Sequence, residues 1–169
     1  MKAKLIIEDK EIEVEISEEE YKKLQLSEEK KTGYERVPKN GHYFYEFGKG
    51  DVESDVEDCY DIDNEYYESA NYYSSETVAE NNARADKLMR QLRRFSVEHR
   101  GRGVDFNSTE TAKHYIYYDC IHDELKTVFT FYAKTFGTIL FDSEETTQAA
   151  IDEFHDELIW YFTKYKDSL

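Results

Sequence analysis

Residues 51–68 constrain the fold most, because they hold nine acidic side chains and no basic one. The first part of this stretch alternates acidic residues with Val52, Ser54 and Val56, which is the period of a half-buried strand. An extended backbone would turn these three side chains toward a core and place the acids on one exposed face, about 6.8 Å apart. The sequence therefore predicts an acidic strand at the protein surface.

Three interpretations of this acidic segment, residues 51–68, are open. Carboxylates at twice the ~3.4 Å charge spacing of a DNA strand could occupy a groove built for phosphates, with tyrosines stacking where bases would. A solvated edge that blocks strand pairing explains the same pattern. A weak Mg²⁺ or Ca²⁺ site is the third, although Tyr66 and Tyr72 stand where an EF-hand loop needs Gly and Glu. The candidate partner-binding residues are Asp51, Glu53, Asp55, Glu57, Asp58, Tyr60, Asp61, Asp63 and Tyr66, with Trp160 near the end of the chain.

Composition places the chain among folded acidic proteins. Its 169 residues carry 38 acidic and 22 basic side chains, a formal net charge of −16, and 15% of them are aromatic. Disordered acidic chains are poor in aromatic residues, so we expect this one to fold. The charge repels nucleic acid and anionic membranes and attracts basic partners. We expect no membrane span, because no apolar run approaches ~20 residues, and reduced thiols at Cys59 and Cys120 in the cytoplasm.

Periodicity and turn signals predict an α+β fold in two parts. Residues 1–32 are expected to form an N-terminal hairpin and a short helix capped by Ser17, and residues 33–169 the main domain. Asn40-Gly41 is the strongest short turn signal, and it predicts a second hairpin within residues 33–47. The main domain would then contain the acidic segment 51–68, a basic helix 75–99, and a C-terminal sheet and helix within 113–166.

Two long amphipathic helices are expected to pack against a three-stranded sheet. Apolar residues recur at helical spacing within residues 75–99 and again from Asp142, the predicted N-cap, to about Lys166. Between the helices, residues 114–119, 125–132 and 138–141 have the composition of strands. The fold prediction is therefore antiparallel hairpins and a three-stranded sheet packed with these two helices.

The predicted basic helix has a positively charged surface, in contrast to the acidic segment. Residues 84–102 carry seven basic side chains against two acidic ones. These bases could be solvated or hold acids of the same chain, or they could contact nucleic acid or another protein. The net charge makes direct nucleic-acid binding the weaker alternative. The candidates for it are Arg84, Lys87, Arg90 and Arg94. Trp160, which falls among acids on the last helix, could anchor a second copy of the chain or be covered by its own domain.

Signals of catalysis are weak. The sequence has no P-loop, no G-x-S-x-G and no H-E-x-x-H, and its five histidines are scattered. Asp105 with Glu124 and Lys126 imitates the acidic pair and lysine of some metal-dependent nucleases, but the Glu-x-Lys spacing recurs by chance in so charged a chain. We therefore expect no catalytic residue, no metal and no cofactor.

Strand, cap and amphipathic-helix patterns recur in residues 31–37, 66–73, 92–95 and 137–162. These stretches resemble small acidic proteins encoded by phages and prophages of Firmicutes, some of which are anti-CRISPR inhibitors of Cas9. The resemblance implies a non-enzymatic inhibitor that acts in the cytoplasm of an infected bacterium on a basic nucleic-acid-binding protein, a Cas9-like effector first. The alternatives are a phage assembly protein that forms homo-oligomers and a nucleic-acid-binding accessory protein that uses the basic helix.

Overall fold

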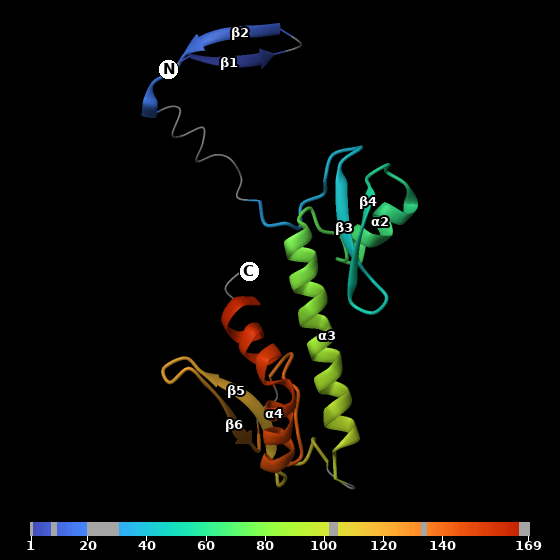
Figure 1. Ribbon diagram of the computed structural model, residues 1–169, viewed down its shortest axis with the longest axis vertical. Coiled ribbons are helices and arrows are strands. Elements are labelled where there is room, and N and C mark those ends of the chain that lie inside the picture. Colours follow the sequence, from blue (N-terminus) through green and yellow to red (C-terminus); the bar gives the residue numbers. More distant parts are fainter. Residues whose placement is uncertain (1, 8–9, 20–30, 102–104, 133–134, 166–169) are drawn as a thin grey trace. The chain divides into compact units, whose positions relative to one another are not determined.

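The chain divides into two compact units, Met1–Thr32 and Gly33–Leu169, in a computed structural model (Figure 1). In the first unit, β1 (Lys2–Ile7) and β2 (Lys10–Glu15) form an antiparallel hairpin. Residues 18–19 are helical, and the rest of the helix predicted after Ser17 lies outside the described residues. The structure describes residues 2–7, 10–19, 31–101, 105–132 and 135–165.

The second unit, called the main unit below, is built along one long helix. Figure 1 shows α3 running lengthwise, with β3, β4 and α2 beside one half and β5, β6 and α4 beside the other. None of its described helices is both long and apolar enough to cross a membrane. The elements are β3 (His42–Phe47), β4 (Asp51–Val56), α2 (Asp61–Glu68), α3 (Glu76–Glu98), β5 (Lys113–Asp119), β6 (Glu124–Thr130), α4 (Glu144–Trp160) and a π-helix, η1 (Tyr161–Tyr165).

Tyrosines form the core beside the first half of α3. The ring of Tyr43 stacks on Tyr72 with centroids 4.2 Å apart, and Tyr45 stacks on Tyr66 at 4.4 Å. Tyr43, Tyr45 and Tyr72 are buried. Aromatic rings thus supply the apolar area that this strongly acidic part of the chain otherwise lacks.

The hairpin beside this tyrosine core differs from the predicted one. Asn40, at φ 68°, forms a turn closed by the Gly41 amide donating to the Pro38 carbonyl at 2.8 Å, and this turn leads into β3. The turn between β3 and β4 contains Gly48 and Gly50, both with positive φ. The prediction that Asn40-Gly41 joins two paired strands was therefore wrong, because Gly48 and Gly50, eight and ten residues after Asn40, provide the left-handed positions that the hairpin needs.

Aliphatic and phenyl side chains form a second core around the other half of α3. Leu88, Leu92 and Phe95 of α3 pack with residues of α4 and the segment before it, and all of them are buried. Leu125 of β6 and Ile116 of β5 pack at its margin. The α4 side of this core consists of Phe141, Ala150, Ile151 and Leu158.

The predicted three-stranded sheet was wrong. β5 and β6 form a two-stranded antiparallel sheet, as do β3 and β4, and the predicted third strand contributes one isolated bridge between Phe141 and His114. On the side away from β5, the Leu140 carbonyl accepts a hydrogen bond from Ser96 Oγ of α3 at 2.6 Å, which ties this segment to α3. The N-cap of α4 then follows at Ser143.

The prediction of two long amphipathic helices was also wrong. α3 has 23 residues, but α4 has 17 and is interrupted at Phe154, whose φ of −110° and ψ of 20° are not helical. The Phe154 ring meets Phe95 edge-on at 5.8 Å, which places the interruption against the core. Beyond Trp160 the helix continues as η1, where Thr163 Oγ1 donates to the Ile159 carbonyl at 2.7 Å, a back-bond that bends helices.

Candidate partner-binding surface

β4 presents three of the predicted acidic residues as a row. Asp51, Glu53 and Asp55, the acidic row, are exposed. Glu53 pairs with Tyr45, and Asp55 with Tyr43. Residues directly opposite each other in an antiparallel pair share a face of the sheet, so the row flanks the tyrosine core.

The other face of β4 carries its apolar residues. Val52 and Val56 are half-buried, and Val52 pairs with Glu46, whose carboxylate meets Arg90 of α3 at 2.7 Å. This face is therefore turned toward α3. Ser54, predicted to point to the core with the valines, is exposed instead.

Glu57 does not belong to the exposed row. It follows β4, is 1% exposed, and accepts hydrogen bonds from Arg36 Nε at 2.8 Å and Arg36 Nη2 at 2.9 Å. The Tyr72 hydroxyl, at 2.8 Å, and the Cys59 amide, at 2.9 Å, also donate to it. The bond from Arg36 outweighs the effect of burial and lowers the pKa of Glu57 to about 2. Glu57 is thus a buried anion that ties the end of β4 to the segment before β3.

Asp63 is the second acid of the segment that points inward. It is 2% exposed and accepts the Tyr43 hydroxyl at 2.9 Å. Its other oxygen accepts the backbone amides of Asp58 at 3.1 Å and Tyr60 at 2.9 Å. Tyr60 is the N-cap of α2 and Asp63 its third residue, so the carboxylate closes the start of the helix. Asp63 therefore fixes α2 against β3.

α2 itself was not predicted, since only a strand was expected within residues 51–68. Helical geometry exposes Ile62 and Tyr67 beside Tyr60, and these two residues were missed as candidates. The signal that could have found α2 was the pair Asp61 and Asp63 in a first turn, which the helix dipole favours.

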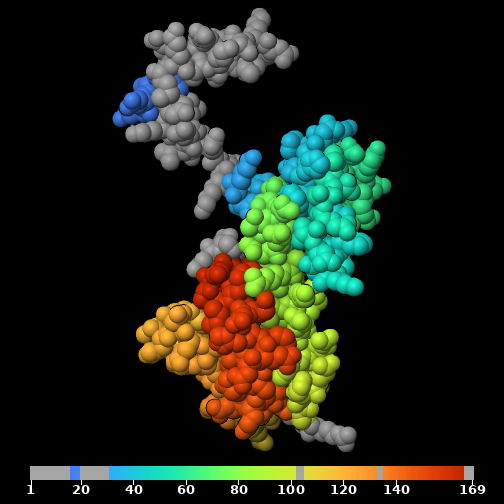
Figure 2. Space-filling model, in the orientation of Figure 1, coloured from blue at the N-terminus to red at the C-terminus, as the bar shows by residue number. Residues whose placement is uncertain are grey.

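The acidic surface is defined here as the acidic row with Asp58, Asp61, Tyr60, Ile62 and Tyr67. Asp58 is half-buried and Asp61 is exposed. Tyr60 is 67% exposed, whereas Tyr66 is half-buried in its stack with Tyr45. Among the described residues, none of the five acids of this surface forms an ion pair. In the space-filling view the elements that carry it form a lobe beside α3 (Figure 2).

The predicted basic residues of α3 face carboxylates of the same chain. Arg84 makes a two-bond pair with Glu157, at 2.8 and 3.0 Å. Arg90 meets Glu46 at 2.7 Å, and Arg94 lies 3.9 Å from Glu98. The guanidinium of Arg84 also covers the Trp160 ring at 4.0 Å.

Trp160 packs against Arg84, and Lys87 approaches Gly50, the residue next to Asp51 of the acidic row. Trp160 is half-buried between Arg84 and Tyr165, so its own unit covers it in part. Lys87 is exposed and lines a groove of about 770 Å³ between α3 and α4, whose other charged residues include Asp152 and Glu153.

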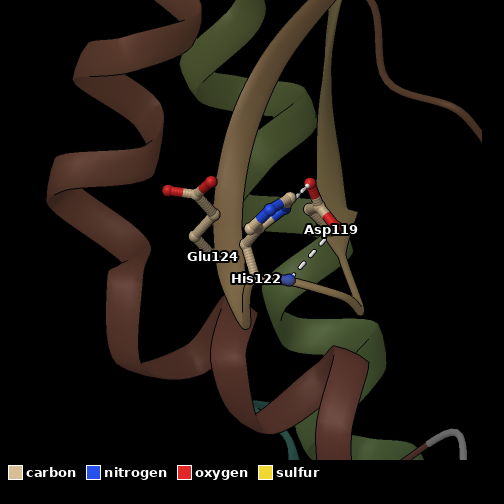
Figure 3. A group of neighbouring side chains, drawn as sticks. All are labelled: Asp119, His122 and Glu124. Carbon is tan, nitrogen blue, oxygen red and sulfur yellow. Dashed lines mark hydrogen bonds and ion pairs between the residues drawn. The ribbon is translucent and has the colours of Figure 1, made fainter.

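The turn between β5 and β6 gathers Asp119, His122 and Glu124, whose ligand atoms lie within 4.8 Å of one another (Figure 3). His122 Nδ1 lies 2.8 Å from the Asp119 carboxylate. Lys126 Nζ lies 2.7 Å from Asp119 and 2.5 Å from Glu124, so both carboxylates already pair with a cation of the chain. Asp105, the remaining member of the nuclease-like set, accepts the backbone amide of Asn107 in a local turn.

Comparisons with protein-family models, with curated proteins and with solved structures found no match to this chain. The chemistry of the surfaces described above is therefore the basis for the proposals that follow.

Proposed function

We propose that this chain is a non-enzymatic inhibitor that binds a basic, nucleic-acid-binding protein and occupies its nucleic-acid groove with the acidic surface. The observation that carries the proposal is that the acidic residues within 51–68 fall into a buried set and an exposed set. Glu57 and Asp63 are buried and hydrogen-bonded, whereas the acidic row and Asp61 are exposed and form no ion pair among the described residues. A basic groove would supply the counter-charges that the chain does not.

Rigid presentation of these charges supports the proposal. Arg36 and Tyr72 hold Glu57, and Tyr43 holds Asp63, so both ends of the strand-to-helix connection are tied to the tyrosine core. A surface that is ordered before binding loses less conformational entropy on association. The acids therefore need little rearrangement to meet a partner.

The spacing of the acidic row also supports mimicry of nucleic acid. Alternate residues of a strand lie about 6.8 Å apart, close to twice the ~3.4 Å step between phosphates of one DNA strand. Tyr60, Ile62 and Tyr67 add exposed apolar area beside the acids. Aromatic side chains at the centre of an interface commonly contribute much of its affinity.

The resemblance to small acidic phage proteins makes a Cas9-like effector in a bacterial cytoplasm the first partner to test. Its guide and target channels are positively charged and hold nucleic-acid backbones. Direct binding of nucleic acid by α3 has less support, since Arg84, Arg90 and Arg94 already face carboxylates.

The test is binding to purified Cas9–guide complex and inhibition of its DNA binding. The variant Asp51→Asn, Glu53→Gln, Asp55→Asn removes the acidic row and leaves Glu57 and Asp63 in place. The control variant Glu80→Gln, Glu110→Gln, Glu153→Gln removes the same charge from exposed positions elsewhere. We expect the first variant to lose affinity by about tenfold or more and the control to change it far less, because only contacting charges are desolvated.

Salt provides the second readout. Association of the unmodified chain should slow steeply as salt rises, because steering between opposite charges is screened over about 10 Å at 0.1 M. No binding by the unmodified chain, or equal losses in the two triple variants, would refute the proposal.

A further inference from the structure

The two hairpins of the main unit share one arrangement that leaves the same edge open in each. The first strand of each hairpin is bridged on its outer side, β3 through Phe44 to Tyr73 and β5 through His114 to Phe141. Each second strand has one neighbour among the described strands. β4 and β6 therefore each present an edge that pairs with no other strand in the part of the chain that the structure describes.

The two open edges differ in how they are protected. β4 carries the acidic row, and charged side chains on an edge strand hinder pairing with other chains. β6 has charges only at its start, where Glu124 and Lys126 are bound to each other. From Thr127 it continues with Val128 and Phe129, which favour strands. β6 therefore lacks the protection that β4 has.

Apolar surface is concentrated around this hairpin. Among the described residues, five of the eleven exposed large hydrophobic side chains lie between residues 117 and 136. Phe129 on β6 is 59% exposed. An exposed apolar area next to an open strand edge is typical of an interaction surface. The five residues are Tyr117, Ile121, Phe129, Tyr132 and Phe136.

The net charge of the β5–β6 hairpin indicates which kind of partner this surface binds. Residues 113–132 contain three acids and two lysines, whereas residues 51–68 contain nine acids and no base. A nearly neutral surface offers no attraction to a strongly basic protein. Two copies of a chain with a net charge of −16 also meet with less repulsion through this surface than through the acidic surface.

We propose that two copies of this chain pair along β6, antiparallel about a two-fold axis at Thr127, and join their β5–β6 hairpins into a four-stranded sheet. In this register Leu125 lies opposite Phe129 of the other copy, which is a favourable cross-strand pair. A register centred on Lys126 would place two lysines opposite each other, which disfavours it. The interface is self-complementary, as a two-fold dimer requires. This dimer is independent of the inhibitor function proposed above.

The first experiment measures mass in solution by sedimentation equilibrium over a range of concentrations. The full chain should form a dimer of twice 20.1 kDa. Phe129→Glu should weaken the dimer by about tenfold or more, because each copy brings one such charge into the interface. Phe47→Glu is the matched control, since Phe47 is 55% exposed on β3 and outside the interface. A monomer at every concentration, or equal effects of the two variants, would overturn the proposal.

The second experiment tests the register by disulfide formation, with Cys59→Ser and Cys120→Ser as background. Opposed residues of an antiparallel pair have Cα atoms about 4.5 or 5.5 Å apart, within the range of about 4.4–6.8 Å that disulfides span. Thr127→Cys should therefore yield a covalent dimer under mild oxidation. Tyr117→Cys, a 49% exposed position on β5 opposite Lys126, should not. Cross-linking of Thr127→Cys no faster than of Tyr117→Cys would exclude this register.

Discussion

At the scale of single residues, the acidic segment has two kinds of carboxylate with opposite roles. Glu57 accepts four hydrogen bonds and is buried, whereas Glu65, eight residues later, is exposed. Removing one partner of a buried ion pair leaves the other charge without compensation, which is strongly destabilising. The acids of one short stretch therefore differ greatly in what they contribute to stability.

Glu57→Gln should destabilise the main unit by about 3 kcal/mol, the low end for a broken buried pair, because Arg36 is one-third exposed. Urea unfolding followed by circular dichroism measures the change. Glu65→Gln is the control and should stay within about 0.5 kcal/mol of the parent. Similar values for the two variants would show that the pair does not stabilise the fold.

The ion pair between Arg36 and Glu57 also predicts that the free energy of unfolding falls at acidic pH. The pKa of Glu57 falls from an ordinary 4.5 to about 2 in the folded protein. Its contribution to stability is therefore complete above pH 4.5 and is lost as the pH falls toward 2. Urea unfolding of the parent between pH 5 and pH 2.5 should show a steeper loss of free energy than that of Glu57→Gln. Parallel curves for the two proteins would contradict this prediction.

The sequence alone does not separate the buried carboxylates of this segment from the exposed ones. Alternation correctly places the exposed side chains of Asp51, Glu53 and Asp55 on one face of a strand, because a strand has a period of two. It does not show that this face of the hairpin also carries the buried Tyr43 and Tyr45. It cannot identify Glu57 as buried, since that depends on Arg36, 21 residues earlier, and on Tyr72, 15 residues later. Contacts at such separations leave no periodic signal.

At the scale of elements, the two halves of the main unit repeat one pattern. A hairpin is followed by a bridge residue, Tyr73 or Phe141, and two residues later by a serine N-cap, Ser75 or Ser143. The sequence shows the extended stretch before each helix, but it places the N-cap of α4 at Asp142, one residue before the observed Ser143. It does not show that the extended stretch before α4 pairs with β5 through one bridge only, because strand composition does not reveal how many residues find a partner.

The two serine N-caps should differ in how much stability the protein loses when each is changed to alanine. Ser143 Oγ accepts the Thr146 amide at 3.1 Å, whereas Ser75 makes no side-chain cap bond. Ser143→Ala should therefore cost about 1 kcal/mol of stability, and Ser75→Ala should cost clearly less. Urea unfolding of the two variants beside the parent makes the comparison. A larger loss for Ser75→Ala would contradict the cap geometry.

At the scale of the whole molecule, the main unit contains both of its hydrophobic clusters. Every residue of those clusters, with the residues packed at their margins, lies between Val37 and Phe162. The sequence predicts the division after residue 32 from its hairpin and cap signals, and the structure divides the chain at Thr32. It does not predict two separate cores on one helix, because a single apolar stripe along residues 75–99 is compatible with one continuous core.

We expect residues 33–169 alone to fold and to unfold within a few degrees of the full chain. The physical reason is that the groups that bury apolar area in this unit belong to it. Thermal unfolding by circular dichroism of the two proteins, at equal concentration, tests this. A fall in Tm of more than about 8 °C, roughly 2 kcal/mol for a chain of this size, would show that residues 1–32 contribute to the stability of the main unit.

The position of Trp160 gives a probe that is separate from the tyrosine core. It is the only tryptophan in the sequence, and it lies beneath Arg84 and beside Tyr165, whereas Tyr43, Tyr45, Tyr66 and Tyr72 stack with one another in the tyrosine core. Indole fluorescence therefore reports on the packing of α4 and η1 against α3, and near-ultraviolet tyrosine dichroism includes the stacked rings of the tyrosine core, without any added label. Superimposable melting curves from the two signals would mean that α3 couples these two regions into one cooperative transition.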